Sequence, residues 1–300
     1  MSFFAVLLAL VIEQLKPLPR NNWIHAALEA WVDWTGRNFD AGKSHHAWIV
    51  WAVSVLTPGL CFSLLFIVIH HYSLILALVF DVAVLYLTLG FRQFSHYFTD
   101  IRDALERGDE IEARRLLAEW RHLDASELPR TELLRHVLEH ALLAAHRHVF
   151  GVFFWFVLLS TLGLGPLGAV IYRMAEFASR WWTYPSKTLG MPANPRLMAV
   201  SQRMFSWIDH VPARLTAFGF AVVGNFEEAI NRWRRDATLW QHDNEGVILA
   251  AAAGAVGVQL GGQAAPGVTP ERSRTFEAGG TGLPGTAAGS TTGAPAQMGH

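Results

Sequence analysis

Residues 47–70 read AWIVWAVSVLTPGLCFSLLFIVIH, an apolar stretch long enough to form a helix across ~30 Å of hydrocarbon at ~1.5 Å per residue. Pro58 and Gly59 lie in its middle, so we expect a kink there. Neighbouring helices must then satisfy the carbonyls that the proline leaves free. After a short turn, residues 73–90 read SLILALVFDVAVLYLTLG. The pair predicts a helical hairpin in which Asp81, midway along the second arm, faces a partner in the bundle or is uncharged.

Further apolar runs extend this pattern outward. The opening MSFFAVLLALVIEQLKPLPR lacks a basic leading segment and a small-x-small cleavage site, which predicts a short first membrane helix that stays on the protein. Residues 149–172 form another membrane-length run, in which glycines and a proline at 163–168 predict a broken or re-entrant segment. A fifth run covers 207–224, and the small-residue segment 247–262 is too weak to assign as a span.

Composition agrees with a membrane protein. Only 16% of the 300 residues are charged and 52% are hydrophobic, whereas soluble domains carry about a quarter charged residues. The single cysteine, Cys61, excludes a disulfide framework and a thiolate metal site. The net charge of −1 gives no support for nucleic-acid binding. We therefore predict an all-α polytopic membrane helical bundle, with the lipid bilayer as its first partner.

Charge distribution divides the chain into four parts. Residues 1–90 and 149–262 hold the membrane helices. Residues 91–148 show the stripe of amphipathic helices with a turn at Gly108, which predicts a solvated helical insertion that offers a docking place for a protein partner. Residues 263–300 are rich in Gly, Ala, Thr and Pro and predict a disordered C-terminal tail. The excess of Lys and Arg places 91–148 and the tail in the cytoplasm.

The fifth run carries polar residues at its start, Asp209, His210 and Arg214, and Arg173 closes the run before it. Charges at the mouth of a membrane segment are costly and are candidates for function. Two alternatives stay open for the arginines: they snorkel to lipid headgroups, or they line a polar site. Asp209, three residues before Pro212, is predicted to cap a helix that the proline begins.

Metal and nucleotide motifs give no site. The 14 histidines include His136 and His140, four residues apart, but HVLEH lacks the order of a zinc-protease helix and a third ligand is missing. Phosphate-binding glycine motifs and a serine-nucleophile elbow are absent from the sequence. We predict no metal and no cofactor from these patterns.

Three ordered stretches carry a resemblance to a known family. They are GPLGAVIYRMAEFASRW at 165–181, VPARLTAF at 211–218 and DNEGVILAAAAGAVGVQLGG at 243–262. Together they resemble the CobD/CbiB family of membrane-bound cobalamin-biosynthesis proteins. The residues on the family's positions are Tyr172, Arg173, Pro212, Ala213, Arg214, Leu215, Thr216, Asn244, Gly246, Gly257, Gly261 and Gly262.

This resemblance implies an enzyme that joins an aminopropanol unit to adenosylcobyric acid through an amide bond, with ATP and Mg²⁺ as cofactors. Within it, the candidate polar site is Arg173, Asp209, His210, Arg214 and Asn244. However, the family's polar run before the middle span is replaced by EHALLAAHRHVFG. The opening L-L-x-L-x-x-E-x-L and the Asp ahead of the proline are similar to AmpE, a related inner-membrane protein. The sequence alone thus favours an AmpE-like protein in cell-envelope or β-lactamase-related signalling, without standard cobinamide synthase activity. The alternatives are the synthase itself and a structural partner.

Overall fold

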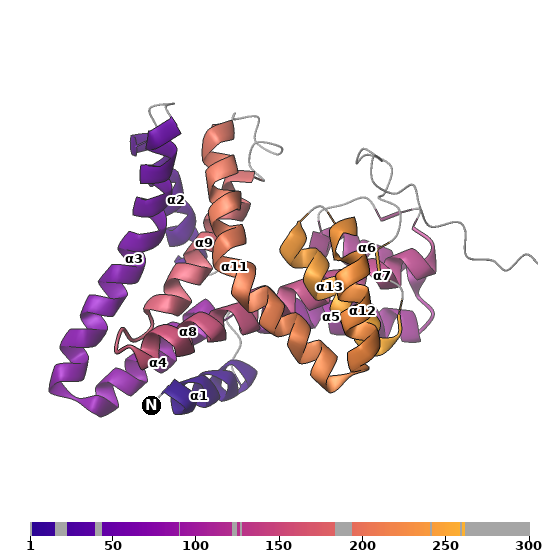
Figure 1. Ribbon diagram of the computed structural model, residues 1–300, viewed down its shortest axis with the longest axis horizontal. Coiled ribbons are helices and arrows are strands. Elements are labelled where there is room, and N and C mark those ends of the chain that lie inside the picture. The colour runs from indigo at the N-terminus through magenta and orange to yellow at the C-terminus, as the bar shows by residue number, and fades with distance from the viewer. Residues whose placement is uncertain are drawn as a thin grey trace, which may run out of the picture. The chain divides into compact units, whose positions relative to one another are not determined.

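The apolar residues 47–70 lie in one helix of the computed structural model, α3 (Ser44–Tyr72). Ser73 caps the next helix, α4 (Leu74–Thr88), by accepting a hydrogen bond from the backbone N–H of Leu76 at 3.3 Å. The predicted hairpin is therefore confirmed (Figure 1). The structure describes residues 2–15, 23–39, 44–89, 91–121, 125–126, 128–183, 194–240, 242–258 and 260–261.

Two prolines lie inside long helices, and each has the same compensation. Pro58 in α3 removes the N–H that would bond the carbonyl of Ser54, and the indole of Trp31 donates to that carbonyl at 3.1 Å. The indole of Trp155 likewise donates to the carbonyl of Ile208, four residues before Pro212, at 3.1 Å. Neighbouring helices thus satisfy both freed carbonyls, as predicted for Pro58.

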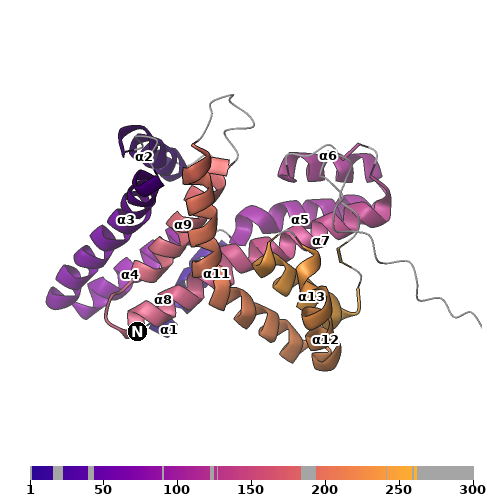
Figure 2. The ribbon, with the colours of Figure 1, turned by 45° about the horizontal axis from the view of Figure 1, so that its top comes forward.

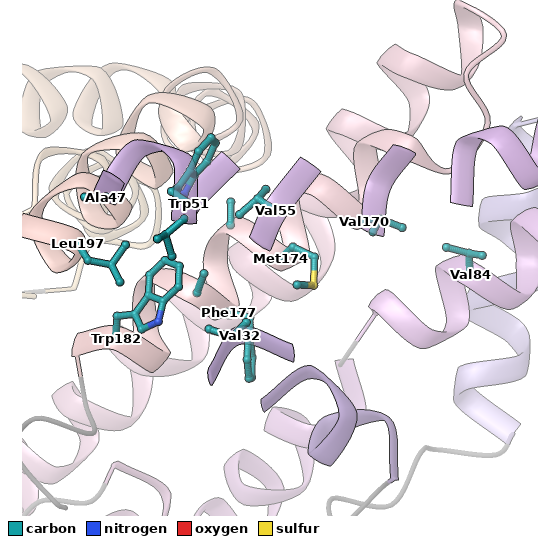
Figure 3. Close-up of a cluster of buried hydrophobic side chains, with 13 residues drawn as sticks. Val32, Ala47, Trp51, Val55, Val84, Val170, Met174, Phe177, Trp182 and Leu197 are labelled. Atoms are coloured by element: carbon teal, nitrogen blue, oxygen red, sulfur yellow. The ribbon is translucent and has the colours of Figure 1, made fainter. Parts of the chain in front are cut away.

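The N-terminal helices pack on α3 and α4. Helix α1 (Ser2–Leu15) has 14 residues and spans about 21 Å, less than a hydrocarbon layer. Its fully buried Ala5 and Ala9 join a core with residues of α4, α8 and α9. Helix α2 (Trp23–Phe39) contributes Val32 to a second core, in which side chains of α3, α9 and α11 meet (Figure 3).

The predicted amphipathic insertion consists of α5 (Phe91–Glu106), α6 (Glu110–Arg121) and α7 (Arg130–Ala145). Gly108 makes the turn between the first two with φ 79°, a left-handed conformation that glycine adopts without strain. Ile101 and Leu117 lie in the buried core of this part, and Ile111 is exposed. The prediction of amphipathic helices is confirmed.

Helix α7 does not end where the insertion was expected to end. It continues through a π-helical turn, η1 (His146–Phe150), into α8 (Gly151–Thr161). The predicted break follows: Gly163 and Gly165 have φ of 80° and 57°, and α9 (Leu167–Thr183) returns along α8 (Figure 2). The boundary predicted at residue 148 therefore lies inside a continuous helical stretch.

The C-terminal part corrects one prediction. Helix α11 (Pro195–Val223) is capped by Asn194 and continues through Pro212, so Asp209 is inside a helix and caps nothing. The reason is that a neighbouring indole satisfies the carbonyl freed by the proline, and the helix need not restart there. Helix α12 (Phe226–Asp236), the short η2 (Ala237–Leu239) and α13 (Asp243–Val256) then pack back on α11. The compact unit ends at Gly262, and the tail predicted to be disordered lies outside the described residues.

Two helical stretches in the described part are long and apolar enough to cross a membrane, His46–Tyr72 and Arg130–Thr161. Helices α1 and α4 are apolar but shorter. The fifth predicted run lies within α11, whose inward face carries polar residues.

Candidate functional site

One carboxylate, that of Asp209 in α11, collects hydrogen bonds from three other elements. Its Oδ1 lies 2.8 Å from Nε2 of His146 in η1 and accepts a 2.7 Å bond from the hydroxyl of Tyr172 in α9. Its Oδ2 accepts a 3.3 Å bond from the amide of Asn244 in α13. Asp209 is only 4% exposed and His146 1%. Because a buried carboxylate is tolerated when its oxygens are satisfied, this network fixes the four elements around one atom group.

His146 is held at both ring nitrogens. Its Nδ1 lies 2.9 Å from Oγ1 of Thr216, which is two helical turns beyond Asp209 on the same face of α11. The π-turn is marked by the hydrogen bond from the N–H of Gly151 to the carbonyl of His146, five residues back. Such turns occur frequently at functional sites because they re-aim side chains out of the regular helical pattern.

Asn244 connects the network to a partly exposed guanidinium. Its amide also donates to the carbonyl of Ser206 at 2.8 Å, and its Oδ1 accepts a 3.3 Å bond from Arg214. Arg214 donates in addition to the backbone carbonyl of His210 at 2.9 Å. The side chain of His210 itself is exposed. Arg214 is thus oriented by Asn244, which is in turn oriented by Asp209.

A second buried carboxylate, Glu176 in α9, lies beside this network. It is 1% exposed and accepts bonds from Arg173 at 3.0 Å and from Nε of Arg180 at 2.5 Å. Burial alone would raise the pKa of Glu176, but Arg180, Arg173 and Arg147 outweigh it and hold that pKa below the usual value. The charge of Asp209 also acts on Glu176, so the two centres are electrostatically coupled.

The turn of η1 adds a third ion pair. Arg147, next to His146, donates to the carboxylate of Glu245, next to Asn244. Two consecutive residues of η1 therefore bind two different helices. His146 binds Asp209 in α11, and Arg147 binds Glu245 in α13. These contacts join η1, in the middle of the continuous α7–α8 stretch, to α11 and α13.

Two glycines allow this close packing. A Cβ on Gly151 would lie 2.2 Å from the hydroxyl oxygen of Tyr172, so any side chain there displaces the tyrosine from Asp209. A Cβ on Gly246 would lie 1.9 Å from the backbone carbonyl of Ala237, which keeps the start of α13 against η2.

Comparison with known proteins identifies the lineage of this site. The family described as CobD/Cbib protein matches residues 3–279. The chain belongs to the CobD/CbiB family.

Relatives agree with this assignment. A protein of Stutzerimonas stutzeri named cobalamin biosynthesis protein CobD is 30% identical over 268 residues, which is 87% of this chain and 83% of that protein. One of the same name from Chromobacterium violaceum is 33% identical over 63% of this chain and 58% of its own length. One from Mycobacterium tuberculosis is 32% identical over 58% of this chain and 54% of its own length. No solved structure gives a significant match.

The family motifs meet at the Asp209 network. Asp209, Asn244 and Arg214 were singled out from the sequence, and the structure links them by hydrogen bonds. Arg173 binds Glu176, whereas Arg214 binds Asn244 and the carbonyl of His210, so the two arginines do not share a partner. His210 contributes only its backbone.

Sequence reasoning missed several members of the site. They are His146, Arg147, Glu176 and Glu245. The HRH triplet at 146–148, in the middle of a long apolar stretch, was the available signal for the first two. For Glu176, the signal was its position inside the family stretch, one turn after Arg173.

The donor set fits oxyanions better than Mg²⁺. That ion prefers free carboxylate and water oxygens, but the three carboxylates here are held by His146, by arginines and by Asn244. In the described ranges, residues of the metal-ligating types do not gather in groups of three or more. Partly exposed guanidinium groups, in contrast, are suited to carboxylates and phosphates. The described residues therefore do not fit Mg²⁺.

Proposed function

We propose that this protein acts in cobalamin biosynthesis by joining a carboxylate to an amine in an amide bond, as the family resemblance implies. The observation that carries the proposal is the similarity to a protein named cobalamin biosynthesis protein CobD along 87% of the chain. The convergence of the family's Tyr, Arg and Asn positions on one buried network supports it.

The chemistry assigns tasks to the partly exposed cations. Amide formation requires one carboxylate oxygen to leave, so the carboxylate needs prior activation by phosphoryl transfer, which the resemblance assigns to ATP; the amine then displaces phosphate, and ADP is the other product. Arg214 offers donors to the substrate oxyanion, and Asn244 and Asp209 orient it. His146 and Tyr172 are too deeply buried to touch a substrate and act by holding Asp209.

The setting we propose is the bacterial inner membrane, crossed several times. Support comes from the two membrane-length helical stretches and from many exposed large apolar side chains on α1, α3 and α4. Of the region predicted to be cytoplasmic, 91–148, the part before the second stretch, residues 91–129, then lies in the cytoplasm, where it offers a surface to a protein partner. Reporter fusions after residues 120, 190 and 265 test this topology, because an alkaline-phosphatase signal at 120 or 265 contradicts it.

The AmpE-like signalling role is the second candidate. Its support is the opening pattern that includes Glu13, a residue buried at 4% exposure. The comparisons add nothing to it, since the relatives described above are all named for cobalamin biosynthesis.

Complementation separates the two roles. We expect the chain to restore growth of a cobalamin auxotroph that lacks the synthase and is supplied with aminopropanol. Arg214→Ala should abolish rescue. Arg203→Ala, on the same helix, is the control and should not, because the Arg203 guanidinium stacks on Trp207 at 5.2 Å instead of binding Asn244. Equal membrane levels of both variants are checked by immunoblot. No growth with the well-expressed parent chain contradicts the proposed activity and favours the signalling role.

A further inference from the structure

A second buried aspartate lies away from the Asp209 network, in a cavity of about 230 Å³. Asp81, in the middle of α4, is 3% exposed and lines this cavity. Its Oδ1 has no hydrogen-bond partner among the residues that the structure describes. An ionised carboxylate in apolar surroundings is costly without a counter-charge, so a cation bound in this cavity would stabilise the ionised form of Asp81.

The walls of the cavity show what kind of group fits. Ser2 and Ser160 bring hydroxyl oxygens, 2.7 Å apart, and the ring of Phe66 lies on another side. The hydroxyl oxygens are acceptors for the N–H groups of an ammonium, and an aromatic side chain such as Phe66 can attract its charge. Apolar side chains complete the lining and suit a short alkyl chain: Leu74, Ala77 and Leu78.

The size argues against a bare ion. A water takes about 30 Å³ of liquid volume, so the cavity holds a group of several heavy atoms. A small metal cation needs a close shell of oxygens, and two of the oxygens here bind each other. A primary ammonium on a short chain matches both the volume and the mixed lining.

The place of the cavity indicates a source. It lies where both membrane-length stretches end, since it is lined by His70 near the end of α3 and by Ser160 at the end of α8. Its rim residues His70, Leu74 and Gly163 are exposed, so the cavity opens outward. In the membrane orientation proposed above, that opening lies at the depth of the lipid headgroups.

We propose that this cavity binds a primary ammonium group, supplied by the headgroup of a membrane aminophospholipid. Asp81 forms the ion pair with the ammonium, and the serine hydroxyls accept its remaining N–H groups. The ammonium class rests on the cavity alone, and the lipid source rests on the proposed membrane placement.

Lipid preference is the first test. We would measure lipid retained by the purified full chain, by native mass spectrometry, from nanodiscs of phosphatidylethanolamine with phosphatidylglycerol and from nanodiscs with phosphatidylcholine in place of the former. The parent chain should prefer phosphatidylethanolamine, and Asp81→Asn should lose about tenfold or more of that preference, the effect of one charge-assisted hydrogen bond. Asp103→Asn, at an exposed acid on α5, should leave it unchanged. Equal preference in the parent and Asp81→Asn overturns the proposal.

Soluble cations are the second test and need no variant. In detergent without aminophospholipid, ethanolamine should raise the unfolding midpoint of the parent chain more than choline or sodium chloride at equal ionic strength. Stabilisation by ethanolamine with no lipid preference identifies a soluble amine as the source. Stabilisation by sodium alone overturns the ammonium class.

The chain's own α-amino group is a competing cation, because Ser2, the second residue of the chain, lines the cavity. A chain acetylated at its amino terminus should therefore bind ethanolamine at least as well as the free chain. Absence of binding in both forms overturns the proposal. The outcome of these tests is independent of amide-bond formation, which complementation measures separately.

Discussion

The carboxylates of α6 and of the site differ in their partners and in their exposure to water, with different consequences for the fold. Glu112 in α6 lies 2.6 Å from Arg115, yet their side chains are 36% and 61% exposed. Asp209 is 4% exposed and accepts bonds from residues far apart in the chain. Exposed pairs contribute little because water solvates each partner equally well, whereas a buried carboxylate depends on every donor it has. The comparison teaches that the insertion uses charge for solubility and the site uses it to fix geometry.

The largest expected effect concerns the buried carboxylate of Asp209. Asp209→Ala leaves His146, Tyr172 and Asn244 without their common acceptor, and it should lower the free energy of unfolding by about 3–5 kcal/mol. The measurement is thermal or denaturant unfolding in detergent, followed by circular dichroism. Asp103→Ala serves as the exposed control and should stay within about 0.5 kcal/mol. Similar losses for both variants contradict the comparison.

Packing gives the next effect. Gly151→Ala places a methyl group 2.2 Å from the Tyr172 hydroxyl, so it should cost about 1–3 kcal/mol through displacement of the ring. Gly219→Ala is the matched control in α11, because nothing lies within 4 Å of its added Cβ. That control should stabilise by up to about 1 kcal/mol through helix propensity. If both substitutions stabilise, Tyr172 does not need its position.

The third-largest effect concerns the hydrogen bond from the Trp155 indole to the backbone carbonyl of Ile208. Trp155→Phe removes the donor to the carbonyl of Ile208 and should cost about 1–2 kcal/mol. In the double variant with Pro212→Ala, the restored N–H replaces the indole, so the second substitution should recover part of the loss. A purely additive double-mutant cycle would show that the indole and the proline are not coupled.

The effect of pH on stability through Glu176 should be smaller than the effects of the substitutions above. Because its pKa is lower in the folded chain than in the unfolded one, its ion pairs stabilise the protein above the usual glutamate range near pH ~4.3. That stabilisation is lost as the pH falls through the folded-state pKa. Unfolding midpoints between neutral and acidic pH should therefore fall less steeply for Glu176→Gln than for the parent chain. Parallel curves would remove Glu176 from the set of buried ion pairs.

The smallest effect lies on the surface. Arg115→Ala breaks the pair with Glu112 and should change the free energy of unfolding by less than about 0.5 kcal/mol, and still less in high salt. A loss above 1 kcal/mol, measured by the same unfolding experiment, would show that α6 uses its charges as the site does.

Sequence reasoning succeeded where a local pattern determines the structure. The hairpin of α3 and α4, the turn at Gly108 and the break at Gly163 all follow from the spacing of apolar residues and glycines. It failed at Asp209, because a proline three residues later is a good signal for a helix start. Only the indole of Trp155, 57 residues upstream of Pro212, shows that the helix continues.

The site was harder to predict because its members come from distant segments. Motif positions found Arg214 and Asn244, but the regular period of 3.6 residues gave no reason to turn His146 toward α11. That orientation depends on the π-turn, which no residue pattern announces. Glu176 and Glu245 were hidden for a related reason, since their partners Arg173 and Arg147 also fit snorkelling or surface roles.

The π-turn η1 has a consequence for how this chain tolerates insertions and deletions. A hydrogen bond that spans five residues accommodates one residue more than a regular turn does, so η1 has the form of a single-residue insertion in a long α-helix. Removal of one residue from this wide turn, such as Val149, would leave a regular helix in which α8 keeps nearly its present phase relative to α7, because the wide turn already absorbs the extra residue. Trp155 would then still face Ile208 and Gly151 would still face Tyr172, whereas His146 would lose the turn that directs it to Asp209. A one-residue deletion at residues 146–150 should therefore spare the packing of α8 and disrupt the Asp209 network, whereas the same deletion inside α8 would rotate the rest of that helix by about 100°.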